Sequence, residues 1–369
     1  PRSAVPPAST RPPAATAAPR PTTAPSPGSA AATVPLTAEQ LAGQRVVYSY
    51  PGLTPPPSLL EDVRAGRAAG VIFFGQNTSD PVLFRAAVAQ LREAQRQSPV
   101  RAPLLLMTDQ EGGLVRRLPG APDLSARQVG QAADPVLAAA LAGTGAGRNL
   151  ADYGLNVNLA PVLDVYAQSG DFIDHSQRSF GSDPAAVTAL GSAFITAQQQ
   201  TGVAATAKHF PGLGTAPAGA NTDEGPVTLD APASRLTGTD EAPYPAAIAA
   251  GVRLVMVSWA VYPTLDAAHP AGLSTAVVRG LLRGQLGFRG VTITDALEAG
   301  AVQAAGGTGE RAVDAAAAGM DLLLCSAQDS AQGEAATTAL ATALTAGRLD
   351  RADFAAAAER VTALRATLH

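Results

Sequence analysis

Eight short apolar segments recur along the sequence, and each is followed by a stretch with helical spacing or by a loop. Most of them are continuous apolar runs, which is typical of strands buried on both faces in a parallel sheet covered by helices. This repetition predicts an α/β protein with a (β/α)8 TIM barrel. A doubly wound open sheet is the alternative that periodicity leaves open. The predicted strands cover residues 45–50, 70–75, 103–109, 156–165, 203–210, 253–259, 290–296 and 319–325.

Helix starts carry clear signals between these segments. An acidic N-cap residue precedes a proline at the first helical position in Asp80-Pro81, Asp134-Pro135 and Asp183-Pro184. We expect Ser274 to cap a later helix and Asp350 to cap the last one. No second folded domain is expected, so the barrel is assigned to residues 36–369.

The N-terminal segment has a different composition. Residues 1–34 consist mainly of Pro, Ala, Thr and Ser, and no acidic residue occurs before Glu39. Such a segment cannot bury enough apolar surface to offset its ordering entropy, so residues 1–35 are predicted to be a disordered linker. The chain starts at Pro1 instead of Met. We therefore expect a processed, secreted protein or lipoprotein, extracellular or associated with the cell envelope, with a possible lipid anchor upstream.

Charge and residue usage exclude several classes of protein. A formal net charge of -4 argues against a nucleic-acid partner, which requires a basic surface. No apolar run is long enough to predict a membrane-spanning helix. The single cysteine, Cys325, cannot form an intramolecular disulfide and is expected in the core. No ligand set suggests a metal or a cofactor, and we expect a monomer.

Polar residues lie where several predicted strands end, which is where a (β/α)8 barrel carries its active site. Asp109 ends the third strand and Asp164 lies near the end of the fourth, with Arg178 in the loop beyond it. The fifth strand ends at Lys208-His209 and the seventh at Asp295. If the barrel is correct, these side chains converge on one pocket.

The residue types suggest roles in sugar binding and catalysis. Lys208 is the single lysine among 26 basic Lys and Arg residues, and its compact charge with three donors suits several sugar hydroxyl groups. Asp109 with Arg117 and Arg178 would suit hydroxyl recognition, although a salt-bridge network around the rim is the structural alternative. His209 is expected to donate a hydrogen bond to substrate. Asp295 is suited to act as a nucleophile or, less well, as a metal ligand.

Six motifs together resemble the N-terminal barrel domain of family 3 glycoside hydrolases, and most closely the single-domain bacterial β-N-acetylglucosaminidases. The resemblance covers roughly residues 36–369, with the motifs in the family's order. They are "DQEGG" (109–113), "APVLDV" (160–165), "RSFG" (178–181), "KHFPG" (208–212), "TDALEAGAV" (294–302) and "AGMDLLL" (318–324).

The resemblance implies a retaining mechanism through a covalent glycosyl-enzyme, with Asp295 at the position of the nucleophile. It implies a carbohydrate substrate, usually N-acetylglucosamine β-linked in cell-wall fragments such as those of peptidoglycan. The residues that fall on positions holding the terminal sugar are Asp109, Arg117, Arg178, Lys208 and His209.

The chain departs from this family in the loop that should carry the acid/base. In the subfamily that group is a histidine paired with an aspartate, in a loop beginning Lys-His-Phe-Pro-Gly-His-Gly and ending in Asp-Ser-His. Here Leu213 replaces the first loop histidine, and Asn221, Thr222 and Asp223 stand in place of the triplet. No histidine lies between His209 and His269.

Three readings of this departure stay open. In the first, Asp223 or Glu224 is the acid/base, with a pKa raised by burial or by the charge of Asp295. In the second, no loop residue donates a proton, and the enzyme is slow or acts only on substrates with good leaving groups. In the third, the protein is a catalytically silent barrel that binds sugar or peptidoglycan. A structural envelope protein that presents the linker is a further class, against which the polar set at the strand ends argues.

Overall fold

Eight parallel strands close into a barrel in the computed structural model, which describes Ala4 and residues 35–368. Their order around the barrel is β1-β12-β11-β8-β7-β6-β3-β2, and β1 pairs with β12 to close it. The strands are β1 (Val46–Tyr48), β2 (Gly70–Ile72), β3 (Leu105–Thr108), β6 (Val157–Asn158), β7 (Ala204–Phe210), β8 (Leu254–Val257), β11 (Val291–Ala296) and β12 (Leu322–Leu324). Each lies within one of the predicted segments. The barrel is therefore confirmed, and the open-sheet alternative is wrong.

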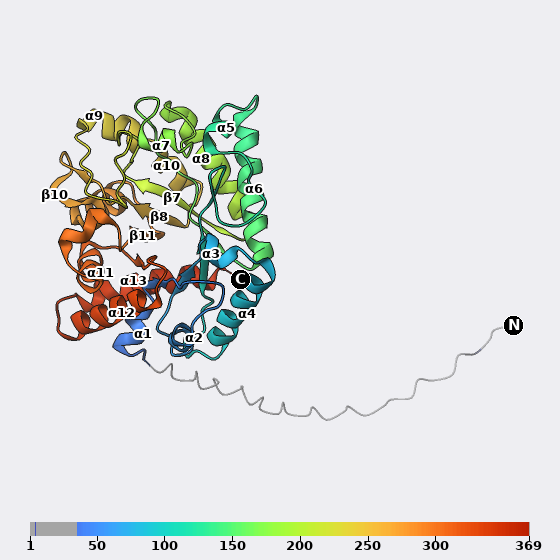
Figure 1. Cartoon of the computed structure of the whole chain (residues 1–369), viewed down its shortest axis with the longest axis vertical. Helices are drawn as coiled ribbons and strands as arrows, with labels where there is room; N and C mark the ends of the chain where they lie inside the picture. The colour runs from blue at the N-terminus through green and yellow to red at the C-terminus, as the bar shows by residue number, and fades with distance from the viewer. Residues whose placement is uncertain (1–3, 5–34, 369) are drawn as a thin grey trace. The chain divides into compact units, whose positions relative to one another are not determined.

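Helices surround the barrel; Figure 1 shows β7, β8 and β11 in the middle of the domain and α4, α6, α11 and α12 on its outside. The α-helices are α1 (Ala38–Gly43), α2 (Pro57–Arg64), α3 (Gly75–Thr78), α4 (Pro81–Arg96), α5 (Ala126–Gly130), α6 (Pro135–Tyr153), α7 (Phe172–His175), α8 (Pro184–Gln199), α9 (Ala233–Arg235), α10 (Pro243–Ala249), α11 (Thr308–Ala318), α12 (Ser330–Thr345) and α13 (Arg351–Ala366). Turns of 3-10 or π type are η1 (Leu236–Asp240), η2 (Ala271–Leu273), η3 (Ala276–Gln285) and η4 (Gly300–Ala305).

The four predicted aspartate caps form as expected. Asp80, Asp134, Asp183 and Asp350 each accept hydrogen bonds from backbone N–H groups in the first turn of the following helix. Ser274 Oγ accepts from the N–H of Val277 at 3.2 Å, although the helix that follows it is of π type. Asp80, Asp134 and Asp183 cap helices α4, α6 and α8, which follow barrel strands, so these three N-termini lie on the same side of the barrel as the C-terminal ends of the strands.

The barrel interior is filled with the apolar side chains that the strands point inward. Val47, Met107 and Ile293 belong to this inner cluster, and Val361 and Leu364 of α13 pack against it. Arg365, also on α13, donates to the carbonyl oxygens of Ala102 and Pro103, directly before β3. Helix α13 therefore covers the N-terminal ends of the strands, and the opposite end of the barrel is left for the site.

Two short sheets lie outside the barrel, β4 (Gln110–Gly112) with β5 (Val115–Arg116) and β9 (Val261–Tyr262) with β10 (Asp266–Pro270). Cys325 is fully buried, as predicted. In the described part of the chain, no helix is long and apolar enough to cross a membrane. The predicted linker over 1–35 lies, apart from its fourth and last residues, outside the described residues.

Candidate active site

A pocket of about 340 Å³ opens at the C-terminal ends of the strands. Its floor is apolar and belongs to the filled interior of the barrel. Phe74, Val115 and Phe172 contribute to its walls. All seven residues predicted from the sequence line this one pocket: Asp109, Arg117, Arg178, Lys208, His209, Asp223 and Asp295. They come from distant parts of the chain, so only closure of the barrel brings them together.

Two barrel strands lose regular register where they carry site residues. The pairing of β7 with β8 shifts between Ala207 and Phe210, which brackets Lys208 and His209. The pairing of β11 with β12 shifts between Ile293 and Ala296 and so spans Asp295. Such irregularities bend a strand and redirect the side chains at that point. The strand ends therefore turn their polar residues toward the mouth of the barrel.

The Lys208 ammonium lies at the centre of a buried charge network. Its Nζ is 2.9 Å from Asp109 Oδ1 and 2.7 Å from Glu111 Oε1, and its side chain is 2% exposed. Arg178 binds Glu111 with two hydrogen bonds, at 2.9 Å through Nε and 2.8 Å through Nη2. Arg117 is more distant, with Nη2 4.0 Å from Asp109 Oδ2. Charged donors and acceptors are thus held in fixed positions along one side of the pocket.

The charges in this network keep one another ionised. Burial alone would raise the pKa of Glu111, but the positive charges of Arg178 and Lys208 outweigh it and hold that pKa well below its ordinary value. Burial would lower the pKa of Lys208, but the charges of Asp109 and Glu111 outweigh it and raise that pKa. Glu111 and Lys208 are therefore both charged at neutral pH.

Glu111 was not singled out from the sequence, although it lies within the quoted "DQEGG". It follows the end of β3 by three residues and belongs to the short strand β4. Asp109 and Glu111 are two residues apart in extended backbone, and side chains at that spacing point to the same side. This alternation is the signal that would have added Glu111 to the site.

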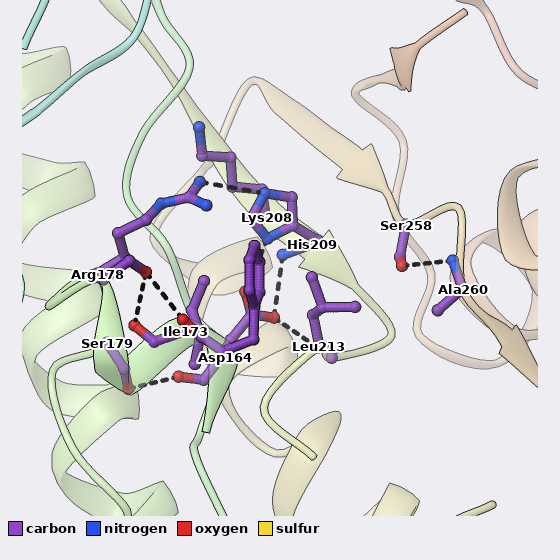
Figure 2. Close-up of polar contacts among 12 residues, drawn as sticks. Asp164, Ile173, Arg178, Ser179, Lys208, His209, Leu213, Ser258 and Ala260 are labelled. Carbon is purple, nitrogen blue, oxygen red and sulfur yellow. Dashed lines mark hydrogen bonds and ion pairs between the residues drawn. The ribbon is translucent and has the colours of Figure 1, made fainter. Parts of the chain in front are cut away.

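His209 is oriented by Asp164, which is fully buried and lies next to it, as Figure 2 shows. The Nδ1 of His209 is 2.7 Å from Asp164 Oδ2, and the other carboxylate oxygen accepts from the backbone N–H groups of His209 and Leu213. Arg178 Nη2 lies 3.4 Å from His209 Nε2, which must accept there because a guanidinium only donates. Asp164 therefore favours the imidazole with its proton on Nδ1 and also fixes the start of the following loop.

That loop packs closely against the strand-end region of Asp164. A Cβ atom at Gly214 would lie 1.9 Å from the carbonyl oxygen of Val165, so no larger residue fits at this position without movement. Leu213, at the position where the family resemblance predicts a histidine, is 3% exposed and lines the pocket. The first part of the loop is thus a packed, apolar wall and contributes no proton donor from that position.

Asp295 is held at the end of β11. Its Oδ1 accepts from the N–H of Ala296 at 2.8 Å. The buried indole of Trp259 donates to the carbonyl oxygen of Ala296, also at 2.8 Å. Both contacts fix the backbone on which the Asp295 carboxylate stands, with that carboxylate lining the pocket.

Asp223 reaches the pocket from the second part of the loop, whereas Glu224 is not among the residues that line it. The backbone N–H of Asp223 donates to Asn221 Oδ1 at 3.0 Å, and Glu224 Oε1 accepts from Asn221 Nδ2 at 3.2 Å. Partial burial at the pocket mouth, followed by the negative charge of Asp295, raises the pKa of Asp223 to about 6. The residue is exposed on its outer side, so it can exchange protons with water.

Glu298 also lines the pocket and was not singled out from the sequence. It accepts from the hydroxyl of Ser326 at 2.6 Å and from Gln332 Nε2 at 3.0 Å. These contacts join the segment after β11 to the loop after β12 and to the first turn of α12. Among residues 35–368, no group of three or more His, Cys, Asp or Glu side chains is arranged to hold a metal ion.

Comparison with known proteins agrees with this geometry. The sequence matches the model of the glycosyl hydrolase family 3 N terminal domain over residues 43–364. It is 45% identical to an uncharacterized secreted glycosyl hydrolase of Arthroderma benhamiae, over 92% of this chain and 97% of that protein. It is 36% identical to a β-hexosaminidase of Stenotrophomonas maltophilia, over 69% of this chain and 75% of that protein.

A solved structure shows the same fold. The family 3 β-N-acetylglucosaminidase from Paenibacillus sp. str. FPU-7 superposes with a TM-score of 0.83 and 34% identity. The match covers 90% of this chain and 63% of that longer one. The family model spans most of the chain, and the relative from Arthroderma benhamiae aligns along nearly its whole length. The chain therefore belongs to glycosyl hydrolase family 3.

Proposed function

We propose that this protein is a retaining hexosaminidase that removes one terminal β-linked sugar, with N-acetylglucosamine as the expected unit. Asp295 is the nucleophile and Asp223 is the acid/base. The observation that supports this assignment is that one pocket holds both carboxyl groups beside the charged network around Lys208. Among the described residues, Glu111 forms ion pairs with Arg178 and Lys208, whereas neither Asp223 nor Asp295 does.

The pocket suits a single sugar at the end of a glycan. Its volume of about 340 Å³ is near the lower end of the range for small-molecule sites, roughly 300–1,000 Å³. The charged side chains of Asp109, Arg178 and Lys208 offer donors and acceptors to the hydroxyl groups of that sugar. The apolar floor closes the pocket below, so the chain is expected to cut only the terminal unit.

The two carboxyl groups have different tasks in a retaining mechanism. Asp223 protonates the glycosidic oxygen as the Asp295 carboxylate attacks the anomeric carbon, which breaks the glycosidic bond and forms a glycosyl-enzyme ester. The Asp223 carboxylate then takes a proton from water, and that water releases the sugar from Asp295. The acid must be protonated near neutral pH in the first step, and the raised pKa of Asp223 meets that requirement.

The names of relatives support the choice of substrate and location. Relatives of this chain are called β-hexosaminidase and β-N-acetylglucosaminidase, and one is called a secreted glycosyl hydrolase. These names favour a β-linked N-acetylhexosamine as the sugar and an extracellular location. Cell-wall fragments as the natural substrate, and attachment to the cell envelope through a lipid, stay predictions from the sequence.

A silent sugar-binding barrel is the second candidate, and one observation favours it. Leu213 is a buried apolar residue at the position where the related hexosaminidases are expected to carry a loop histidine. If Asp223 does not take over proton transfer, the pocket would bind the sugar without cleaving it.

The deciding experiment measures nitrophenol release from 4-nitrophenyl N-acetyl-β-glucosaminide, with Asp295→Ala as the blank. Turnover above that blank is expected, and it would exclude the silent barrel. Asp223→Ala is expected to slow natural β-glycosides much more than the activated aryl glycoside, because nitrophenolate leaves with little acid assistance. Added azide should partly restore the Asp223→Ala enzyme where release from Asp295 has become limiting.

Three outcomes would contradict the proposal. Unchanged turnover in Asp295→Ala would remove Asp295 as the nucleophile, and equal losses on both substrates in Asp223→Ala would remove Asp223 as the acid. An inactive protein that still binds N-acetylglucosamine by calorimetry would establish the silent barrel instead.

A further inference from the structure

The loop segment that carries Asp223 is docked on the turn that follows the nucleophile strand. The backbone N–H of Gly300 donates to the carbonyl oxygen of Asp223 at 2.8 Å, and the N–H of Ala301 donates to that of Thr222 at 3.0 Å. Thr222 is 4% exposed, so this contact is buried on the loop side. Two backbone hydrogen bonds thus join segments almost eighty positions apart in the chain.

The docked segment is itself a compact turn centred on Asn221. The carbonyl oxygen of Asn221 accepts from the N–H groups of Glu224 and Gly225, both at 3.1 Å. Its side-chain oxygen accepts from the N–H of Asp223 at 3.0 Å. Three hydrogen bonds hold residues 221–225 in one turn, so we expect these residues to shift together. The position of Asp223 therefore depends on where this turn docks.

Gly300 is the point of closest approach between the two segments. A Cβ atom at this position would lie 2.3 Å from the carbonyl oxygen of Glu224 and 2.7 Å from the backbone nitrogen of Gly225. These are backbone atoms, which cannot rotate away as the end of a flexible side chain can. An alanine here therefore requires the turn to retreat by about 1 Å, if ordinary van der Waals separation is to be restored.

The turn that receives the loop is rigidly connected to Asp295. Gly300 starts η4, and only residues 297–299 separate it from β11. That short link is itself held, because Leu297 donates to Leu324 of β12 at 3.0 Å and Ala299 donates to Ala296 at 3.1 Å. A loop docked on Gly300 therefore has a fixed distance to the carboxylate of Asp295.

We propose that Gly300 is a positioning residue, whose missing side chain lets the loop dock and holds Asp223 at its working distance from Asp295. The inference rests on the proposed role of Asp223 as the acid/base. Gly300 itself contributes no group to the reaction; it acts through the placement of the acid. The contact at Gly300 also gives the "EAGAV" part of the "TDALEAGAV" motif a role in placing the acid. The nucleophile Asp295 alone does not account for that part of the motif.

Gly300→Ala should therefore resemble a partial loss of the acid. A misplacement of about 1 Å in a catalytic group can lower a rate by roughly 100-fold. We expect kcat/KM to fall by about that factor on methyl N-acetyl-β-glucosaminide, whose leaving group needs protonation. On the 4-nitrophenyl glycoside we expect a decrease of less than about threefold, since that leaving group needs little acid assistance.

Gly280→Ala is the matched control. Gly280 is exposed in η3, and the nearest atom to a Cβ there, the carbonyl oxygen of Thr275, is 4.0 Å away. This variant should leave both substrates unaffected. A Gly300→Ala enzyme that loses equal factors on both substrates, or none on either, would overturn the proposal.

A failure here is distinguishable from a failure of the proposed function, because Asp223→Ala tests the acid directly. If Asp223→Ala separates the two substrates and Gly300→Ala does not, only the positioning role is wrong. If Gly300→Ala does not fold, hydrogen exchange of the wild-type protein decides instead. The docked loop should protect the amides of Gly300 and Ala301, and exchange at the rate of an open loop would refute docking.

Discussion

The proposed acid makes a specific prediction about the pH dependence of the enzyme. Asp223 must be protonated when substrate is cleaved, and partial burial, together with the charge of Asp295, raises its pKa to about 6. The rate on a substrate with a poor leaving group should therefore fall as the pH rises through 6. Replacing Asp223 with Asn, which has the same shape but no acidic proton, should remove this alkaline limb and lower the rate at pH 5.

The size of the effect follows from the titration of one group. With a pKa of about 6, the protonated fraction of Asp223 is about 0.9 at pH 5 and about 0.01 at pH 8. For the wild-type protein, kcat/KM on methyl N-acetyl-β-glucosaminide should fall about 90-fold between these pH values, because kcat/KM reports the pKa values of the free enzyme. On the 4-nitrophenyl glycoside the decrease should be much smaller.

Initial rates across this pH range, for the wild-type protein and Asp223→Asn on both glycosides, are the measurement. Glu224→Gln is the matched control, since Glu224 is next in the chain but does not line the pocket. It should keep the alkaline limb. An alkaline limb that survives in Asp223→Asn and disappears in Glu224→Gln would refute the assignment and transfer the acid role to Glu224.

Three further predictions concern buried charges. Glu111→Gln should lower the free energy of unfolding by about 3 kcal/mol at pH 7, since it leaves buried cations without their carboxylate. Urea unfolding followed by Trp259 fluorescence measures this, with exposed Glu93→Gln as a control that should not shift the midpoint. The difference in the free energy of unfolding between Glu111→Gln and the wild-type protein should narrow below about pH 4. The depressed pKa of Glu111 stabilises the wild-type fold, and this effect is lost as the pH falls. Asp240 is buried, and burial raises its pKa to about 7, so its ionisation costs stability as the pH rises from about 4 to 7. Asp240→Asn should gain stability relative to wild type over that window, by up to about 1.4 kcal/mol per pH unit in parallel urea titrations. Lys208→Arg should raise KM for the 4-nitrophenyl glycoside by about tenfold or more, because a guanidinium does not fit where a buried ammonium contacts two carboxylates.

Most of the barrel is predictable from the sequence because its signals are local. A strand buried on both faces needs an apolar run, and a helix start needs a cap, so both are written in neighbouring residues. The strand-end rule then places Asp109, Lys208 and Asp295 at the mouth of the barrel without any knowledge of their contacts. Glu111 follows from the same rule once the alternation of extended backbone is applied beyond the end of β3.

The choice between Asp223 and Glu224 could not be made from the sequence. The two carboxylates are adjacent, and both precede a glycine in a loop without periodicity. The structure places Asp223 among the residues that line the pocket and leaves Glu224 outside it. That difference depends on the contact of the loop with Gly300. Gly300 lies in the turn that follows β11, whereas the loop itself follows β7.

By itself, therefore, the sequence determined the repeated strand–helix pattern, the family resemblance and the list of polar residues that could form a site. Tertiary structure decided which of them meet: the ion pairs of Lys208 with Asp109 and Glu111, the orientation of His209 by Asp164, and the docking that brings Asp223 to the pocket. The physical reason is that secondary structure is encoded by neighbours in the chain, whereas each of these contacts joins residues that only the closed barrel brings within hydrogen-bonding distance.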